Sequence, residues 1–194
     1  RYYEGNDILR SWICMPLCVG IYDRAAATMD AMFKSDLYTK DGLLTAQGSK
    51  TFWDRSTLYA FRGAYAAGYA DFITEQLSYY SNRRLLGDHV PYPIEAWPEG
   101  SQRHLSAESG LYCRIITEGM FGIRPTGMRS FELKPEIPSS WEFASLKSVR
   151  AFGSNFDIEV KRLAGDKLRV EVAEKGGKKQ SFTIKQGKTL NVKL

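Results

Sequence analysis

The sequence lacks any uninterrupted apolar run of about 18 residues, so it offers no candidate for a membrane-spanning helix. It also has little cysteine and histidine, with three and two residues respectively. Three cysteines are too few for a scaffold held by disulfides, and two histidines without a Cys or carboxylate cluster do not form a zinc motif. We therefore expect no membrane partner, no metal and no cofactor.

An initiator Met and an N-terminal signal segment are missing as well, since the sequence begins RYYEGND. This beginning predicts an excerpt of a longer protein, whose N-terminal remainder would be the partner of this part. Hydrophobic residues make up 43% of the 194 residues and aromatic residues 13%. That content is enough for a substantial core and excludes a disordered chain.

Positive charge is concentrated toward the C-terminus. From Lys147 onward, twelve Lys or Arg residues stand against five Asp or Glu residues. A basic segment can bind nucleic acid, but these lysines alternate with apolar residues, as they would on the exposed face of a sheet. No nucleic-acid-binding motif accompanies them, so we expect no nucleic-acid partner.

The spacing of apolar residues divides the chain into a helical part, residues 1–124, and a strand-rich part, residues 125–194. Helical spacing predicts helices over residues 6–20, from 23 to the loop at 39–42, over 56–80 and over 106–122. Alternation predicts an antiparallel sheet with one exposed face and strands at 131–134, 156–161, 168–172, 182–185 and 190–193. Small residues in the middle of the third helix, Gly63 among them, favour close approach of neighbouring helices.

The segment from Gly87 to Ser109 is not explained by packing alone. It joins the third and fourth helices, and its three prolines and two glycines keep it out of regular structure. Long loops in compact domains usually bind something. Aromatic rings pack on the C–H faces of sugars, while carboxylates and basic side chains hydrogen-bond to hydroxyl groups. The content of this loop therefore predicts a carbohydrate substrate.

Three glutamates of this segment are candidate catalytic residues, because glycoside hydrolysis needs a protonated carboxyl group and a second, ionised one. Glu108, in the first turn of the fourth helix, would be held ionised by the helix N-terminus, which suits a base. Glu99 lies between a proline and a glycine with no helix or strand to cap, and Glu95 is the third candidate. The structural alternatives are an ordinary first-turn carboxylate for Glu108 and a solvent-facing turn for Glu99. For Glu95 the alternative is an ion pair with Arg103 or Arg84.

Candidate substrate-binding residues lie in the same segment and just before the third helix. They are aromatic or hydrogen-bonding residues, namely Trp97, Tyr92, Arg103, His104, Gln102, Trp53 and Arg55. For Arg103 and His104 a structural hydrogen bond to the loop is an equal alternative. Because each segment precedes a helix, we expect both to open onto one end of a helical barrel.

Motifs around the fourth helix suggest a family. The run SAESGLYCRIITEGMFGIRPTG at residues 106–127 is followed by LKP at 133–135 and IPSSW at 137–141. It resembles the end of the catalytic barrel in six-hairpin glycosidases, which include glucoamylase-like hydrolases and the cellobiose and maltose phosphorylases. The resemblance implies the last helices of an (α/α)6 barrel over residues 1–124, followed by a small antiparallel β-sheet or sandwich domain over 125–194.

The resemblance also implies an activity. Phosphorylases of this family typically carry a Thr-Gly-Ser-like turn at the start of this helix, which helps to hold phosphate. This sequence has SAE at residues 106–108, and a carboxylate repels phosphate. We therefore expect the C-terminal part of an inverting glycoside hydrolase that acts on an oligo- or polysaccharide. Its general acid would lie upstream of the first residue, so the chain by itself would be inactive.

Other activities remain as alternatives to hydrolysis. They are an inverting disaccharide phosphorylase, a polysaccharide lyase or sugar epimerase, and a non-catalytic carbohydrate-binding protein. A periplasmic or secreted location is expected only by analogy with polysaccharide-degrading relatives.

Overall fold

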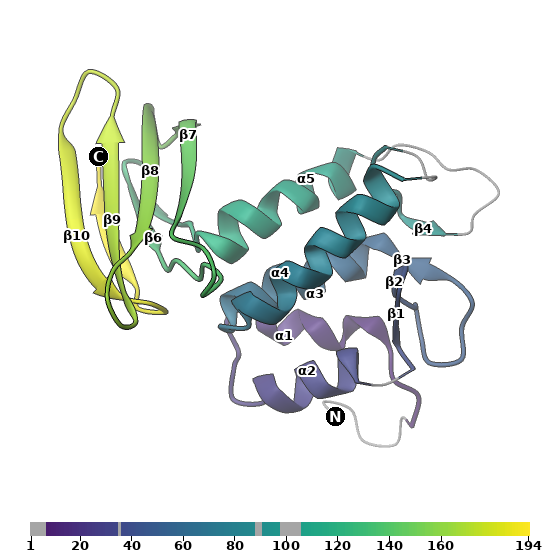
Figure 1. Ribbon diagram of the computed structural model, residues 1–194. Coiled ribbons are helices and arrows are strands. Elements are labelled where there is room, and N and C mark those ends of the chain that lie inside the picture. Colours follow the sequence, from purple (N-terminus) through teal and green to yellow (C-terminus); the bar gives the residue numbers. More distant parts are fainter. Residues whose placement is uncertain (1–6, 35, 88–90, 98–105) are drawn as a thin grey trace. The chain divides into compact units, whose positions relative to one another are not determined.

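The computed structural model describes residues 7–34, 36–87, 91–97 and 106–194 (Figure 1). The chain divides into two compact units, Arg1–Gly119 and Met120–Leu194. The sequence placed this division later, between residues 124 and 125. Met120 and Phe121 fall in the second unit because their carbonyl groups accept the backbone N–H groups of Glu136, at 2.8 Å, and Lys134, at 3.2 Å.

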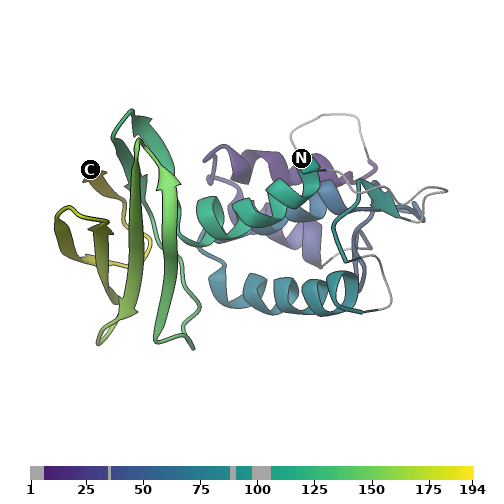
Figure 2. The ribbon, with the colours of Figure 1, turned by 90° about the horizontal axis from the view of Figure 1, so that it is seen from above.

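The first unit is built on short helices packed around a central one (Figures 1 and 2). They are the 3-10 helix η1 (Ser11–Cys14), α1 (Met15–Cys18), α2 (Ala25–Phe33), α3 (Asp54–Ala66), α4 (Ala70–Tyr80), the π-helix η2 (Ser81–Leu85), α5 (Ser106–Arg114) and the π-helix η3 (Ile115–Met120), whose last residue is the first of the second unit. Helix α3 contacts α1, α4 and α5. It contributes fully buried apolar residues, among them Leu58, Phe61 and Tyr65, to the core. Within the described residues, no helix is both long enough and apolar enough to cross a membrane.

Two small antiparallel sheets also belong to the first unit. Strand β1 (Tyr38–Thr39) pairs with β2 (Gly42–Leu43) in a hairpin, and β3 (Phe52–Trp53) pairs with β4 (Ala96–Trp97). The second pair joins segments far apart in the sequence, because Phe52 lies opposite Trp97 and Trp53 opposite Ala96. It therefore fixes the long loop after η2 against the start of α3.

The second unit consists of antiparallel strands in two sheets. One sheet has the order β10 (Lys179–Lys185), β9 (Lys167–Glu174), β8 (Ser154–Arg162), β7 (Phe143–Ala151), and the other has the order β11 (Leu190–Lys193), β6 (Ser130–Leu133), β5 (Arg124–Gly127). Buried residues alternate with partly or fully exposed ones along β8 and β9. The sheets meet through Phe131 of β6 and Phe156 of β8, whose stacked rings have centroids 5.3 Å apart. This contact lies in the core of the unit.

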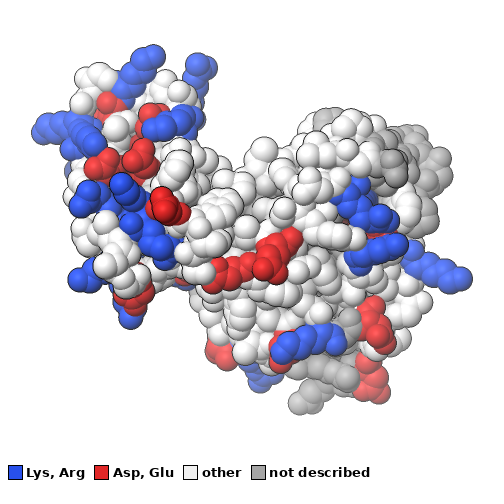
Figure 3. All heavy atoms as spheres, in the orientation of Figure 1, with Lys and Arg blue, Asp and Glu red and all other residues white. Residues whose placement is uncertain are grey.

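The lysines of the second unit lie among acidic side chains. Lys179 binds Glu171 at 2.7 Å and Lys185 binds Asp166 at 2.8 Å. Figure 3 shows positive and negative side chains mixed over the face in view. The positive charge that the sequence concentrates here is thus partly compensated by ion pairs on the sheet surface.

The predicted fold class is wrong. The described residues form no helical barrel, but a mixed arrangement of short helices and four antiparallel sheets. Glycine and proline explain much of the difference. Gly68, with φ of +90°, lies between α3 and α4, so the single helix expected over residues 56–80 is two helices. Pro16 lies in the first turn of α1, which has only four residues instead of extending over 6–20.

Strand alternation located five of the strands in the second unit and missed two. The expected segments coincide with β6, β8, β9, β10 and β11, whereas β5 and β7 were not predicted. Strand β7 lacks regular alternation because its register shifts between Leu146 and Val149. Ser148 has φ of +54° at this bulge, and its N–H donates to Asp157 Oδ1 at 2.7 Å.

Candidate functional site

The β3–β4 pair brings together two segments that the sequence analysis singled out. Trp53 and Arg55 lie at the start of α3, and Glu95 and Trp97 lie near the middle of the long segment between η2 and α5. The rings of Phe52 and Trp97 are 5.6 Å apart across the pair. Ala96 is buried, whereas Glu95 and Trp97 on either side of it are partly exposed, as alternation along an extended segment requires.

Arg55 connects the two segments to α5 by ion pairs. Its Nη1 lies 3.0 Å from Glu95 Oε1, and its Nε donates to Glu108 Oε1 at 2.6 Å. The hydrogen bond to Glu108 raises the pKa of Arg55, so the guanidinium stays protonated over the whole accessible pH range. One permanent positive charge therefore serves two carboxylates.

The two carboxylates differ in their access to solvent. The Glu95 side chain is 42% exposed, and that of Glu108 is completely buried. Both carboxylates lie within hydrogen-bond distance of the same guanidinium. Only Glu95 can also contact a water molecule or a substrate, so Glu108 serves to orient and neutralise Arg55.

Asp54 and Arg84 form a buried ion pair behind this cluster. Arg84 Nη2 lies 3.0 Å from Asp54 Oδ1, and both side chains are almost fully buried. Asp54 Oδ2 also accepts the backbone N–H of Ile94 at 3.0 Å, which ties the long loop to the first residue of α3. Burial raises the pKa of the Asp54 carboxyl group, and the Arg84 guanidinium opposes that shift. The pair thus holds the site together from inside.

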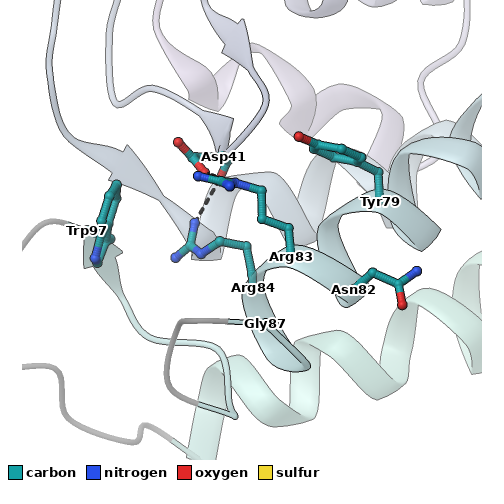
Figure 4. A pocket seen from close by; sticks show the side chains of 7 residues that line it. All are labelled: Asp41, Tyr79, Asn82, Arg83, Arg84, Gly87 and Trp97. Carbon is teal, nitrogen blue, oxygen red and sulfur yellow. Dashed lines mark hydrogen bonds and ion pairs between the residues drawn. The ribbon is translucent and has the colours of Figure 1, made fainter.

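A cavity of about 480 Å³ opens beside Trp97 (Figure 4). Its lining residues are Asp41, Tyr79, Asn82, Arg83, Arg84, Gly87 and Trp97. Arg83 Nε donates to Asp41 Oδ1, and Arg84 Nη1 donates to the carbonyl oxygen of Asp41 at 2.7 Å. The Arg84 guanidinium also lies over the Trp97 ring, 5.5 Å from its centroid. The cavity therefore combines charged hydrogen-bonding groups with aromatic surface.

Some predicted site residues lie at this site and others elsewhere. Trp97 lines the cavity, whereas Trp53 packs edge-on against Trp12 with ring centroids 4.7 Å apart. Tyr92 is partly exposed in the loop before β4. Glu95 pairs with Arg55, not with Arg84. Four predicted residues, Glu99, Gln102, Arg103 and His104, lie outside the described residues.

The polar lining of the cavity was not predicted from the sequence. Asp41 belongs to the β1–β2 turn, Tyr79 to the end of α4, and Arg83 to η2. Basic residues at the end of a predicted helix usually indicate only a favourable interaction with the helix dipole. Their functional signal is the shared cavity, which depends on contacts between distant segments. Among the described residues, no group of three or more His, Cys, Asp or Glu side chains is arranged to hold a metal ion.

No protein-family model, curated protein or solved structure matches this chain. The resemblance to six-hairpin glycosidases therefore depends on the motifs in the sequence alone. Its implication for activity stays a prediction, while its implication of a helical barrel is overturned by the fold.

Proposed function

We propose that this protein is a glycoside hydrolase, or a part of one, in which Glu95 is the carboxylate that activates the attacking water. The observation that carries the proposal is the position of Glu95 in a shared ion pair with Arg55 and the buried Glu108. Arg55 binds the Glu95 carboxylate at 3.0 Å and thereby fixes the position that a general base needs next to its water. Its partial exposure leaves it accessible to water.

The surroundings of Glu95 suit a saccharide. Trp97 lies two residues farther along the same extended segment and is partly exposed, so its ring is available to a sugar close to Glu95. Arg83, Asp41 and Asn82 around the neighbouring cavity provide hydrogen-bond donors and acceptors for hydroxyl groups. A carboxylate beside an aromatic ring and a polar cavity is the combination that glycosidic substrates need.

In the proposed mechanism, Glu95 removes a proton from water as the water oxygen attacks the anomeric carbon. The glycosidic bond breaks, and a second carboxyl group protonates the leaving oxygen, so the configuration at the anomeric carbon is inverted. Arg55 and Glu108 contribute by positioning, since neither reaches the reacting atoms in this scheme.

The test is turnover of nitrophenyl glycosides and neutral oligosaccharides by the full-length protein and its Glu95→Gln variant. We expect E95Q to lower kcat by at least about a hundredfold, which is the usual contribution of an acid–base group. Glu118→Gln is a matched control, because Glu118 is also a partly exposed glutamate paired with an arginine, 2.6 Å from Arg62 Nη1. E118Q should keep normal turnover.

Near-normal turnover by E95Q would reject Glu95 as the base. Hydrolysis with inversion, followed by NMR of the first anomer released, would support the proposed step. A strict requirement for inorganic phosphate would indicate a phosphorylase, and an unsaturated product that absorbs in the ultraviolet would indicate a lyase. Sugar binding without any turnover would indicate a non-catalytic binding protein.

A further inference from the structure

A groove along α4 extends from the cavity beside Trp97. A second hollow, of about 530 Å³, is lined by Thr74, Glu75, Ser78, Tyr79 and Asn82. Tyr79 and Asn82 line both hollows. We call the two together the α4 groove. Each hollow falls within the range of volumes that small-molecule sites occupy, so together they have room for more than one sugar unit.

The charges in the α4 groove are balanced. Arg83 is paired with the Asp41 carboxylate, and Arg84 with the Asp54 carboxylate behind the cavity wall. Glu75 adds a further negative charge in the second hollow. An anionic ligand would find no excess positive charge to attract it here, and the carboxylates of Asp41 and Glu75 would repel it. The groove therefore favours an uncharged ligand.

The hydrogen-bonding groups suit hydroxyl groups in particular. A sugar hydroxyl both donates and accepts; the Arg83 guanidinium, held by the Asp41 carboxylate, offers a donor, and the Asn82 amide, which lines the same cavity, offers an acceptor. Only the Arg83 side chain of this pair is substantially exposed, at 40%. Figure 4 shows Trp97 on one side of the two arginines and Tyr79 on the other. Aromatic rings on both sides of a charged pair offer surfaces for the C–H faces of successive sugar units.

We infer that the α4 groove binds uncharged sugar units of the substrate, next to the unit that is cleaved at Glu95. The inference rests on the proposed function, because it takes the substrate to be a saccharide. The substrate is then a neutral oligosaccharide and not a polyuronate. Arg83 and Tyr79 are the specificity-determining residues.

The test is calorimetric titration of the full-length protein carrying E95Q, which removes turnover during the measurement. The probes are tetrasaccharides of glucose, mannose, galactose and xylose, with tetragalacturonate as the anionic probe of equal length. We expect at least one neutral probe to bind more tightly than tetragalacturonate. Adding Arg83→Gln should weaken that binding by at least about tenfold, the scale of one hydrogen bond to a charged group.

Three further variants separate binding from stability. Tyr79→Ala removes a ring that is 47% exposed, so it should weaken the same probe without unfolding the protein. The control for Y79A is Tyr22→Ala, which removes an exposed tyrosine outside the groove. The control for R83Q is Arg129→Gln, which removes a half-exposed arginine paired with Glu174 in the second unit. Both controls should bind the probe as the E95Q parent does.

Tighter binding of tetragalacturonate than of every neutral probe would overturn the inference, as would unchanged binding in both R83Q and Y79A or no binding of any probe. Failure of the proposed function has a different signature. Neutral binding that depends on Arg83, in a protein that hydrolyses nothing, would retain the groove and reject the hydrolase. Turnover that depends on Glu95, with kcat/KM unaffected by R83Q and Y79A, would retain the hydrolase and reject the groove.

Discussion

At the scale of single residues, burial decides what each carboxylate can do. Glu95 and Glu108 share the guanidinium of Arg55, yet one is accessible and the other is completely enclosed. Asp54 is enclosed as well and has Arg84 and a backbone N–H as partners. Residue type and chain position do not separate these three acids. Their surroundings make Glu95 the only one of them that can reach a substrate.

In the second unit, burial of Glu136 makes the stability of the fold depend on pH. Burial raises the pKa of its carboxyl group, while Lys134, with Nζ at 3.9 Å, and Gln186 oppose the shift. The folded state then binds this proton more tightly than the unfolded state does. The free energy of unfolding therefore falls as pH rises from the ordinary glutamate pKa through the raised one.

Glu136→Gln should remove this pH dependence, because glutamine is neutral at every pH and its side-chain oxygen can still accept from Gln186. As pH rises from about 4 toward 7, the wild-type carboxyl group loses its proton and the wild type loses stability. E136Q should therefore become more stable relative to the wild type over this range. Urea unfolding at a series of pH values measures this difference. Parallel curves for the two proteins would show that the buried carboxyl group does not behave in this way.

At the scale of elements, α3 organises the first unit through close approach to α1. A Cβ atom on Gly63 would lie 2.8 Å from the Leu17 Cβ and 3.3 Å from the Cys18 backbone nitrogen. Cys18 Sγ also donates to the carbonyl oxygen of Tyr59 at 3.1 Å, on the preceding turn of α3. The small residue lets α1 lie directly on α3, and the same helix presents Asp54 and Arg55 to the site.

Gly63→Ala should therefore destabilise the first unit, although alanine is the better helix former. Alanine gains up to about 1 kcal/mol of helix propensity, but overpacking against atoms that cannot rotate away costs about 1–3 kcal/mol. We expect a net loss of about 1 kcal/mol in thermal or urea unfolding.

Gly110→Ala is the matched control, since Gly110 lies inside α5 and a Cβ there would meet nothing within 4 Å. It should leave stability unchanged or raise it. Equal behaviour of the two variants would contradict close packing of α1 on α3.

At the scale of the whole molecule, each unit has a core of its own. The second unit buries Phe131, Phe156 and Val170 among other apolar residues, and its two sheets face each other. All its described strands pair with partners in the same unit. A domain this small is only marginally stable, but it has the buried face that independent folding requires.

Residues 120–194 expressed alone should fold with a β-type circular dichroism spectrum and unfold cooperatively. Phe131→Ala should lower the stability of this segment by about 3–5 kcal/mol, enough to unfold much of it, because it empties the contact between the sheets. Met128→Ala, at a side chain that is 91% exposed, should change little. A wild-type segment without a cooperative transition would contradict independent folding.

The sequence alone determined the local features of this protein. Alternating apolar residues predicted β8, β9 and β10, since a strand with one exposed face repeats every two residues. The two prolines within residues 91–97 predicted correctly that this described stretch forms no helix. Charged and aromatic residues in that loop predicted Glu95 and Trp97 as candidates, and both lie together beside the start of α3.

Only the tertiary structure decided the arrangement of the helices, the roles of the carboxylates and the cavity. Helical spacing continues across Gly68, so it does not reveal the break that separates α3 from α4. The β3–β4 pair, the Arg55 ion pairs and the contact of Arg83 with Asp41 all join segments far apart in the chain. Such contacts depend on how buried faces fit together in space, and periodicity along one segment carries no information about its distant partner.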